Sequence, residues 1–436
     1  MLNASVGLST ERTENVAAKE ALKEALGGMN GKPKLCILAV DHTARKRYNY
    51  NEIIEVVYNE LGEDVLIIGS SVSGIMVNNR LALKSVGMLL LEGDINIDAK
   101  FMFEKSRLNY GNIADDILKY KETVPKRDNQ FMLLFQDGIK LPKETLQRTR
   151  SLNSRMVALM SGFIGKQFQK QFEQFAEQGL GFPSTQELLE KLFKNGWEIP
   201  IIGNVTTNAT DYKSYEFYKN KVLEDSILGV IISGSNNTKF AFGFNHGAVS
   251  TGITCTPTKY IGNFLLKIDG EPALKGYCKA FNIEKDILYE LENQGFVNYY
   301  HVLGAREPDG KSYHLTLTLT DPTMENLIVS GFPFNKIPDK IELFMSNSKM
   351  VLNSAVEAIR KLKEQINEPK FLFGIDCSLR WNCMGDLLDK YIEAIRTELG
   401  KDVPLFMIGS GGEIFGTKNN DYYSNHMTFV PLIGGN

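Results

Sequence analysis

The stretch FLFGIDC at residues 371–377 decides the fold together with two apolar blocks that follow it. A segment with helical spacing of apolar residues comes next, then VPLFMIGSGGEI at 403–414, and last MTFVPLIGG at 427–435. Each apolar block has the length of a β-strand, and the spacing between the first two blocks is typical of a helix. The order strand, helix, strand, strand therefore predicts a βαββ unit over residues 371–436.

The same order of blocks occurs twice more in the chain. In each copy the first strand ends near an aspartate and the second contains a glycine, and such self-similarity in fixed order indicates a duplicated unit. We expect Gly69, Gly203 and Gly409 to lie at equivalent strand ends. The two other copies comprise LCILAVD (35–41), VLIIGSSVSG (65–74) and VGMLLLEGD (86–94), and then FMLLFQD (131–137), QELLEKLF (186–193), IPIIGNVTTN (199–208) and ILGVIISGS (227–235).

Two strands for every helix favour an α/β fold in which internally duplicated βαββ units form mixed or antiparallel sheets covered by helices. The second copy is longer than the others because of a helix-patterned insertion at about 142–181. Beyond Gly243 the chain becomes rich in threonine, glycine and alternating apolar residues, which indicates a change of domain. We predict two domains, 1–254 with the first two repeats and 255–436 with the third.

Bulk composition excludes several classes of protein. A chain of 436 residues that is 43% hydrophobic and 23% charged has ordinary globular composition. A net charge of −3 and the lack of a basic block argue against a nucleic-acid partner. Five cysteines without a CxxC pair argue against a disulfide framework or a zinc ribbon. No signal peptide is visible and no apolar run approaches the ~18 residues of a membrane span, so we expect a cytoplasmic protein without a membrane partner.

The order of these motifs resembles a known family, the FIST N domain with its partner, the FIST C domain. The resemblance covers essentially the whole chain and implies an intracellular sensory input protein that binds a small ligand such as an amino acid. It also implies signalling through a transmitter such as a kinase, here a separate protein, and it leaves homo-oligomers open. One branch of the family binds haem and senses nitric oxide. The motifs are VGLST, LCILAVD, LIIGSSVSGIM, LLLEGD, FQDG, IPIIGN and FNHGAVSTG for FIST N, and KIDGEPALKGY, FGIDCSLR, IGSGGEIFG and HMTFVPLIGG for FIST C.

Two strand exits of the third repeat carry the groups that an amino acid requires. Residues 377–380 (CSLR) follow one strand and residues 409–414 (GSGGEI) follow another, so both lie at one end of the unit. Arg380 offers a fork for a carboxylate, Glu413 can accept an ammonium group, and the glycine turn can present backbone N–H groups. In the alternative, Arg380 and Glu413 only pair with each other. The candidate ligand-binding residues here are Cys377, Ser378, Arg380, Ser410, Gly411, Gly412 and Glu413.

The stretch GSSVSG at 69–74 is the corresponding exit in the first repeat. Ser70 and Ser71 can hydrogen-bond a polar ligand, and we add them to the candidate site. Turn chemistry alone is the alternative explanation for serines between two glycines.

Single residues of the chain suggest two alternative functions, a cysteine nucleophile and a haem ligand. Cys377 is the best candidate nucleophile, but a thiolate needs a neighbouring base or cation, and a buried inert cysteine is the alternative. No histidine pair has ligand spacing, so we predict no metal site, no cofactor and no catalytic residue. Haem needs only one axial histidine, and the context FNHG makes His246 the candidate in that alternative.

We therefore expect a cytoplasmic sensor of a small, amino-acid-like ligand that is not an enzyme. The alternatives are a haem-binding nitric-oxide sensor of the same family and an enzyme that uses Cys377 as its nucleophile.

Overall fold

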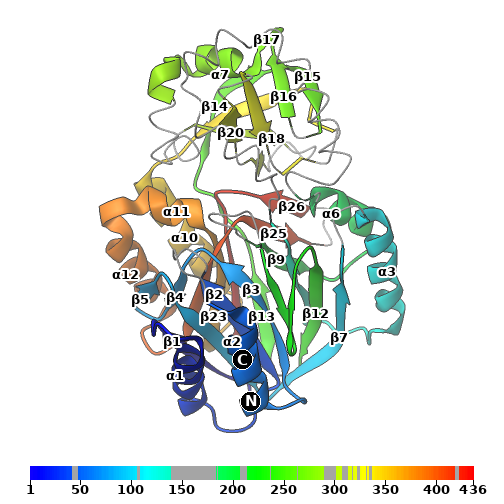
Figure 1. Ribbon diagram of the computed structural model, residues 1–436, viewed down its shortest axis with the longest axis vertical. Coiled ribbons are helices and arrows are strands. Elements are labelled where there is room, and N and C mark those ends of the chain that lie inside the picture. The colour runs from blue at the N-terminus through cyan, green and yellow to red at the C-terminus, as the bar shows by residue number, and fades with distance from the viewer. Residues whose placement is uncertain are drawn as a thin grey trace.

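The computed structural model describes most of the 436 residues and shows a lower body of three sheets beneath a smaller upper module (Figure 1). The predicted helical insertion at 142–181 lies outside the described residues. The residues left out of the description are 42–47, 106–108, 139–182, 184, 207–213, 236, 263, 289–300, 307–312, 317, 322–324, 330, 333–335 and 418–421.

The first six-stranded sheet has the strand order β1-β6-β2-β3-β10-β11, in which β2 and β3 are parallel. Cys36 and Leu38 of β2 face helices α1 and α2, while Ile37 and Ala39 face the centre of the body. Because both faces of β2 are buried, this strand is apolar without alternation. The bounds are β1 Asn3–Ser9, β6 Val86–Glu92, β2 Leu35–Asp41, β3 Leu66–Val72, β10 Glu216–Tyr218, β11 Lys221–Leu223, α1 Glu14–Gly27 and α2 Tyr50–Leu61.

The second six-stranded sheet has the order β7-β12-β8-β9-β25-β26, and helices α3 and α6 cover its outer face. The β8–β9 pair is parallel, and the other pairs are antiparallel. The bounds are β7 Ile95–Phe103, β12 Ile227–Gly234, β8 Gln130–Gln136, β9 Ile201–Val205, β25 Gly412–Gly416, β26 Tyr422–Asn425, α3 Tyr110–Thr123 and α6 Thr185–Lys194.

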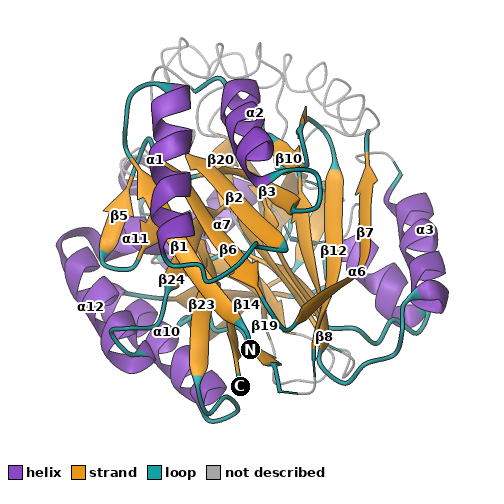
Figure 2. Cartoon of the chain, turned by 90° about the horizontal axis from the view of Figure 1, so that it is seen from below, coloured by secondary structure: helices purple, strands orange, loops and turns teal. Residues whose placement is uncertain are grey.

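The third six-stranded sheet has the order β13-β27-β23-β24-β4-β5, again with one parallel pair, β23–β24. Helices α10, α11 and α12 pack on its outer face. Seen from below, the helices surround the three sheets, which confirms the predicted α/β class with mixed sheets (Figure 2). The bounds are β13 Lys239–Phe242, β27 Phe429–Gly435, β23 Pro369–Cys377, β24 Leu405–Ser410, β4 Ile75–Val77, β5 Arg80–Ala82, α10 Ser348–Lys363, α11 Ser378–Met384 and α12 Leu388–Leu399, with a 3-10 turn at Gly385–Leu387.

Each of these sheets is completed by a hairpin that follows a strand of another sheet. Hairpin β4–β5 comes directly after β3 of the first sheet but pairs with β24 of the third. Hairpin β10–β11 comes after β9 of the second sheet but pairs with β3 of the first. Hairpin β25–β26 comes after β24 of the third sheet but pairs with β9 of the second. The three exchanges close a ring that interlocks the sheets.

One central apolar core fills the space that the three sheets enclose. The inner faces of all three contribute to it, and a fully buried aliphatic or aromatic side chain contributes roughly 1.5–3 kcal/mol. The sheets therefore share one core, and each also has its own layer of packing under its helices. Representative members of the central core are Ile37 and Leu89, Leu133 and Val230, and Phe373 and Phe406, from the first, second and third sheets respectively.

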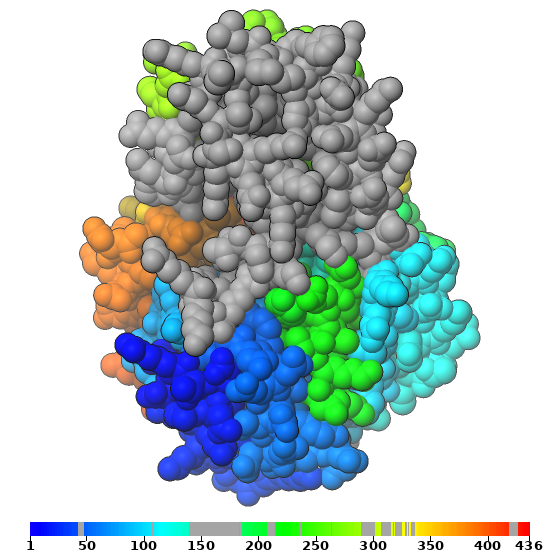
Figure 3. Space-filling view, in the orientation of Figure 1, coloured from blue at the N-terminus to red at the C-terminus, as the bar shows by residue number. Residues whose placement is uncertain are grey.

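The upper module, residues 249–345, consists of two antiparallel sheets and helix α7. Its two ends lie side by side because Val249 of β14 pairs with Met345 of β22. Residues 348–436 then return to the lower body, so blue, cyan, green and orange segments meet there (Figure 3). The predicted domain boundary at 254/255 falls within β14 and stays a prediction. The bounds are β14 Val249–Cys255, β15 Pro257–Ile261, β16 Phe264–Ile268, β17 Glu271–Pro272, α7 Ala273–Phe281, β18 Val302–Arg306, β19 Tyr313–Leu315, β20 Thr318–Asp321, β21 Asn326–Val329 and β22 Ile341–Met345.

The repeated glycines lie in strands, as expected, but only two of them are equivalent. Gly69 and Gly203 lie opposite Leu38 and Leu134 in the neighbouring parallel strands. Gly409 lies opposite Asp376, two residues further toward the strand end, so the predicted equivalence is wrong for this glycine. The shared strand order is what a duplication predicts, and the duplication itself stays a prediction.

Gly69→Ala should destabilise the protein because two strands approach each other closely at this position. A Cβ atom on Gly69 would lie 1.8 Å from the carbonyl oxygen of Leu38, a backbone atom within the sheet. We expect the free energy of unfolding, measured by urea denaturation, to fall by about 2 kcal/mol or more. Gly27→Ala is the matched control, because no atom lies within 4 Å of the added carbon. Equal losses in the two variants would contradict the close-approach explanation.

Candidate functional site

Above the apolar centre, the inner faces of all three sheets carry buried polar side chains. Strand alternation places Ser70 on the same face as Ile68 of β3, and Asn204 on the same face as Ile202 of β9. These residues lie toward the carboxyl ends of the parallel pairs, where α/β folds place their ligands. We define the polar layer as Ser70, Asp137, Asn204, Thr206, Glu216, Ser226, Cys377, Ser410, Glu413 and Thr428, all of which are buried.

A row of four polar side chains crosses from the first sheet to the second. Glu216 of β10 is the register partner of Ser70 in β3, and Glu413 of β25 is the register partner of Asn204 in β9. The side-chain amide of Asn204 donates to Ser70 Oγ at 2.9 Å and joins the two sheets. Because β10 and β25 belong to exchanged hairpins, the exchange is what brings both glutamates into the row.

Glu413 also reaches the third sheet. Its Oε2 accepts the N–H of Thr428 at 3.2 Å, and the Thr428 carbonyl accepts the N–H of Cys377 at 3.0 Å. Ser410 is the register partner of Cys377, and its hydroxyl donates to the Gly412 carbonyl at 2.7 Å. Glu413 therefore stands where the second and third sheets meet.

The two glutamates are buried carboxyl groups with unused hydrogen-bonding capacity. Within the described residues, Oε1 of Glu216, Oε1 of Glu413 and Oδ1 of Asn204 have no hydrogen-bond partner. Burial raises the pKa of Glu216 well above the ordinary carboxyl value, and the charge of Asp137 raises it further. Burial also raises the pKa of Glu413, with a smaller contribution from Asp376. Both carboxyl groups therefore keep their neutral form to a higher pH than an exposed carboxyl group does.

The pairing of the exchanged hairpin β4–β5 with β24 has no row of buried polar side chains like the one above. Where β4 joins β24, the positions that correspond to Glu413 and Asn204 are occupied by Ile75 and Ile408. Both isoleucines are buried in the central core. Among the described residues, the polar row thus involves two of the three hairpin junctions.

Four of the residues predicted from sequence come together in the polar layer: Ser70, Cys377, Ser410 and Glu413. They come from three different sheets, counting β25 with the second, so their proximity depends on the packing of the whole body. Ser70 of the first repeat thus lies in the same buried layer as Cys377, Ser410 and Glu413 of the third. Whether these residues bind a ligand stays a prediction.

The other predicted residues are used within the fold. Ser71 lies on the opposite face of β3, where its hydroxyl accepts a backbone N–H of the segment leading into β10 at 3.1 Å. The N–H of Gly411 donates to the Val205 carbonyl at 3.0 Å, and that of Gly412 donates to Ser410 Oγ at 3.1 Å. The glycine turn therefore closes a β-connection, and these two N–H groups are not open to an anion.

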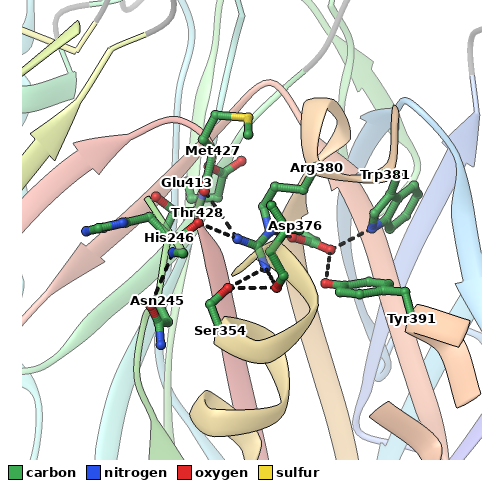
Figure 4. A network of polar contacts seen from close by, with 12 residues as sticks. Asn245, His246, Ser354, Asp376, Arg380, Trp381, Tyr391, Glu413, Met427 and Thr428 are labelled. Atoms are coloured by element: carbon green, nitrogen blue, oxygen red, sulfur yellow. Dashed lines mark hydrogen bonds and ion pairs between the residues drawn. The ribbon is translucent and has the colours of Figure 1, made fainter. Parts of the chain in front are cut away.

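Arg380 is fully buried beside the polar layer and ties together segments around the third sheet (Figure 4). Its Nε donates to Asp376 Oδ1 at 2.7 Å, so its ion pair is with this aspartate and not with Glu413. All five N–H groups of the guanidinium have partners in the protein. Its predicted ligand contact stays a prediction. The other acceptors are the carbonyl oxygens of His246 at 2.8 Å, Met427 at 3.3 Å and Val351 at 3.1 Å, and Ser354 Oγ at 3.1 Å.

Asp376 is the centre of this network. Its second oxygen, Oδ2, accepts Trp381 Nε1 and the Tyr391 hydroxyl, both at 2.6 Å. Helix α11, which begins at Ser378, and helix α12 are thereby attached to the end of β23. Three donors on one buried carboxylate compensate for the water that it lost on folding.

Arg380→Ala should lower the free energy of unfolding by about 3–5 kcal/mol, because it leaves the buried carboxylate of Asp376 without its cation. Urea denaturation followed by circular dichroism measures the loss. Arg380→Lys, which keeps the charge but has only three donors, should lose less than Arg380→Ala. A loss below about 1 kcal/mol in the alanine variant, the size expected for a surface ion pair, would contradict this assignment.

Comparison with known proteins identifies the architecture. A family model described as the FIST N domain matches residues 34–271, which is more than half of the chain. The chain belongs to the FIST N domain family. FIST domains are sensory domains, which agrees with the expectation of a sensor. The matched region includes Ser70, Asn204 and Glu216 but ends before Glu413, and the FIST C domain predicted for 255–436 stays a prediction.

One curated relative is an uncharacterized protein of Methanocaldococcus jannaschii that is 32% identical over 136 residues. The similar region is 29% of this chain and 26% of the length of that protein. The chain thus spans about a quarter of this relative, and the similarity carries no statement about function.

Two polar residues of this FIST protein, Asn204 and Glu216, were not among the predicted site residues. A signal for Glu216 is present in the sequence, because YEFY at 215–218 and GEIF at 412–415 both place one glutamate before two large apolar residues. A charged residue within an apolar strand on a buried face indicates either a partner or a site. The very short strand β10, with three residues, conceals this pattern.

The described residues do not favour the two alternatives, a Cys377 nucleophile or a haem group bound by His246. Burial and the nearby charge of Glu413 raise the pKa of the Cys377 thiol well above its ordinary value, so the nucleophilic thiolate is disfavoured. The Nδ1 atom of His246 accepts the Ala248 N–H at 2.9 Å, and burial lowers the pKa of this imidazole to about 4. Grooves of about 560 and 900 Å³ lie at the lower body, and neither is lined by His246. No metal-ligating cluster is found in the described part of the chain.

The raised pKa values predict a specific dependence of stability on pH. A carboxyl group with a higher pKa in the folded chain stabilises the fold below its unfolded pKa and loses this contribution as the pH rises through the folded pKa. We expect the free energy of unfolding to fall as the pH rises from the ordinary carboxyl pKa of 4.5 through the raised pKa of the folded state, and Glu216→Gln and Glu413→Gln each to reduce this fall. Denaturation at several pH values measures it. Wild-type pH dependence in both polar-layer variants would contradict the raised pKa values.

Proposed function

We propose that this FIST protein senses a small ligand that carries an amino group, an amino acid being the simplest case, and that the polar layer binds it. The observation that carries the proposal is the pair of buried glutamates, Glu216 and Glu413, each with one oxygen that has no partner among the described residues. Leaving a buried polar oxygen without a donor costs free energy. A ligand that brings donors recovers this free energy.

The polar row offers the acceptors that an amine needs. An ammonium group has three N–H donors and no acceptor, and the row presents the unpartnered oxygens of Glu216, Glu413 and Asn204. Ser70 and Asn204 are fixed by their mutual hydrogen bond, so little side-chain freedom is lost when a ligand binds. Since Arg380 is fully engaged, the proposal assigns the amine end of the ligand to this site and assigns nothing to Arg380.

A cationic ligand changes the protonation of the site. A positive charge beside Glu413 favours the ionised carboxylate and lowers its pKa. Binding of an ammonium group therefore releases a proton from the protein, and the affinity rises as the pH rises toward the raised pKa of the carboxyl group. This distinguishes an amine from a neutral hydrogen-bonding ligand of the same size.

The proposal also covers the cellular location of the protein and the partner to which it passes its signal. We propose a cytoplasmic protein that passes its signal to a separate transmitter protein, supported by its membership of a sensory domain family. None of the described helices has the length and apolar character needed to cross a membrane.

A panel of the common amino acids and their 2-oxo acid analogues tests this function by calorimetry on the whole protein. We expect at least one amino acid to bind and its 2-oxo analogue, which lacks the amine, to bind weakly or not at all. Glu413→Gln should weaken binding about ten- to a hundred-fold, because a hydrogen bond to a charged group contributes about 1.5–3 kcal/mol.

Glu92→Gln is the matched control for the ligand titration. Glu92 is also a buried glutamate of the lower body, but it lies at the end of β6 and accepts the N–H groups of Asn30 and Gly31. It should bind like the wild type. The proposal fails if no amine binds, if the 2-oxo acid binds as tightly as the amino acid, or if Glu413→Gln has no effect. A visible spectrum of the purified protein separates this proposal from the haem alternative.

A further inference from the structure

The segment His426–Thr428, which joins β26 to β27, is buried and has an unusual backbone conformation. The three residues have exposed fractions of 4%, 1% and 1%. Met427 has φ = 56°, in the left-handed region that residues other than glycine, asparagine and aspartate seldom adopt. A buried methionine in this region persists only where its surroundings hold it there. We name these three residues the switch segment.

Besides its bond to the Cys377 N–H and the internal bond from the Thr428 hydroxyl to the His426 carbonyl, the switch segment makes one hydrogen bond to each of three other parts of the molecule. The His426 N–H donates to the carbonyl of Leu315 in the upper module at 3.3 Å. The Met427 carbonyl accepts Nη1 of Arg380 at 3.3 Å. The Thr428 N–H donates to Oε2 of Glu413 at 3.2 Å. The carboxyl group of the polar layer and the base of the upper module are thus separated by only three consecutive residues.

We propose that the switch segment couples ligand binding at the Glu413 carboxyl group to the contact between the upper module and the lower body. The proposal rests on the proposed function, since it makes Glu413 the group that the ligand engages. A ligand that binds Oε1 of Glu413 and draws the carboxyl group toward itself weakens the hydrogen bond that Oε2 accepts from the Thr428 N–H. The left-handed conformation of Met427 then loses one of the contacts that constrain it, and the neighbouring His426–Leu315 contact loosens with it.

Within the upper module, Leu315 is connected to the strands that join the module to the lower body. Leu315 ends β19, and the next residue, Thr316, donates its N–H to the Leu303 carbonyl of β18 at 2.9 Å. β18 in turn pairs with β22, whose last residue, Met345, stands at the connection to the lower body. A change at Leu315 therefore reaches the strands that anchor the module.

Hydrogen–deuterium exchange of the whole protein tests the coupling without a ligand. Glu413→Leu removes the acceptor of Thr428 while keeping a side chain of similar size. We expect exchange to rise about tenfold at 426–428, at Thr316 and in β18, because loss of one net hydrogen bond lowers the local opening free energy. Glu216→Leu is the matched control, since Glu216 occupies the corresponding position of hairpin β10–β11 but accepts the Ser226 hydroxyl at 2.9 Å instead of the Thr428 N–H. It should raise exchange near 216–226 and leave Thr316 and β18 unchanged.

Met427→Gly provides a second variant in case Glu413→Leu folds poorly. Glycine adopts φ > 0 freely and does not need to be held there, so the segment becomes more flexible. This variant should also raise exchange at Thr316 and in β18. Unchanged exchange in the upper module in both folded variants, or an equal rise in Glu216→Leu, would overturn the proposal.

The failure of this proposal can be distinguished from the failure of the proposed function. If an amino acid binds in a Glu413-dependent manner but leaves exchange at Thr316 and in β18 unchanged, the site stands and the coupling is overturned. If Glu413→Leu and Met427→Gly raise exchange there as expected while no amine binds, the coupling through Glu413 is supported and the amine ligand is overturned.

Discussion

The exchange of hairpins among the three sheets is the constraint on which the rest of the structure depends. Each six-stranded sheet takes two strands from a segment that follows another sheet, so no sheet is complete until all three are assembled. The contacts that close the sheets link residues more than a hundred positions apart, as in the pairing of β3 with β10 and of β24 with β4. Such non-local pairing makes the lower body one cooperative unit with a single shared core.

This constraint also explains how carboxyl groups come to be buried in the middle of the protein. A glutamate on a short, isolated hairpin would lie in water, but β10 and β25 pair with strands of other sheets, and Glu216 and Glu413 are buried there. The cost of burying Glu216 and Glu413 is offset only in part by Ser226 and Thr428, which leaves one oxygen of each without a donor among the described residues. At the third junction, Ile75 and Ile408 avoid this cost altogether.

Two buried charged networks stand close together and differ in completeness. In one, Asp376 and Arg380 satisfy each other and use every N–H group of the guanidinium. In the other, Glu413 retains unused capacity. A complete network is a structural support, since any ligand would have to displace existing bonds, whereas an incomplete one can accept new bonds. This difference makes Arg380 part of the framework and is the reason that the proposed site uses Glu413.

The sequence alone predicted the parts of this protein that depend on local patterns. Apolar blocks of strand length at LCILAVD and FLFGIDC gave strands buried on both faces, and the α/β class followed from their order with the helices. The sequence placed Ser70, Ser410 and Glu413 among the candidate residues, but their meeting in the polar layer depends on how the three sheets pack. The roles of Arg380, Asn204 and Glu216 could not be predicted, since each depends on which segment is packed against it.

The short hairpins show why such roles could not be predicted from the sequence. Strands β4 and β10 have three residues each, too few for periodicity to be recognised. Their pairing partners lie in other repeats, and no local feature of the sequence specifies them. A residue such as Glu216 is buried only because of that pairing, so its environment is a property of the assembled body and not of its own segment.

The pairing of Val249 with Met345 has a consequence for how such a protein can diversify. An inserted module whose two ends leave the host at one point can be replaced by another without rethreading any strand of the host. The three interlocked sheets cannot be altered piecemeal, because each depends on the other two. The architecture thus combines an indivisible lower body with an upper module that can be exchanged, so the two parts can change independently.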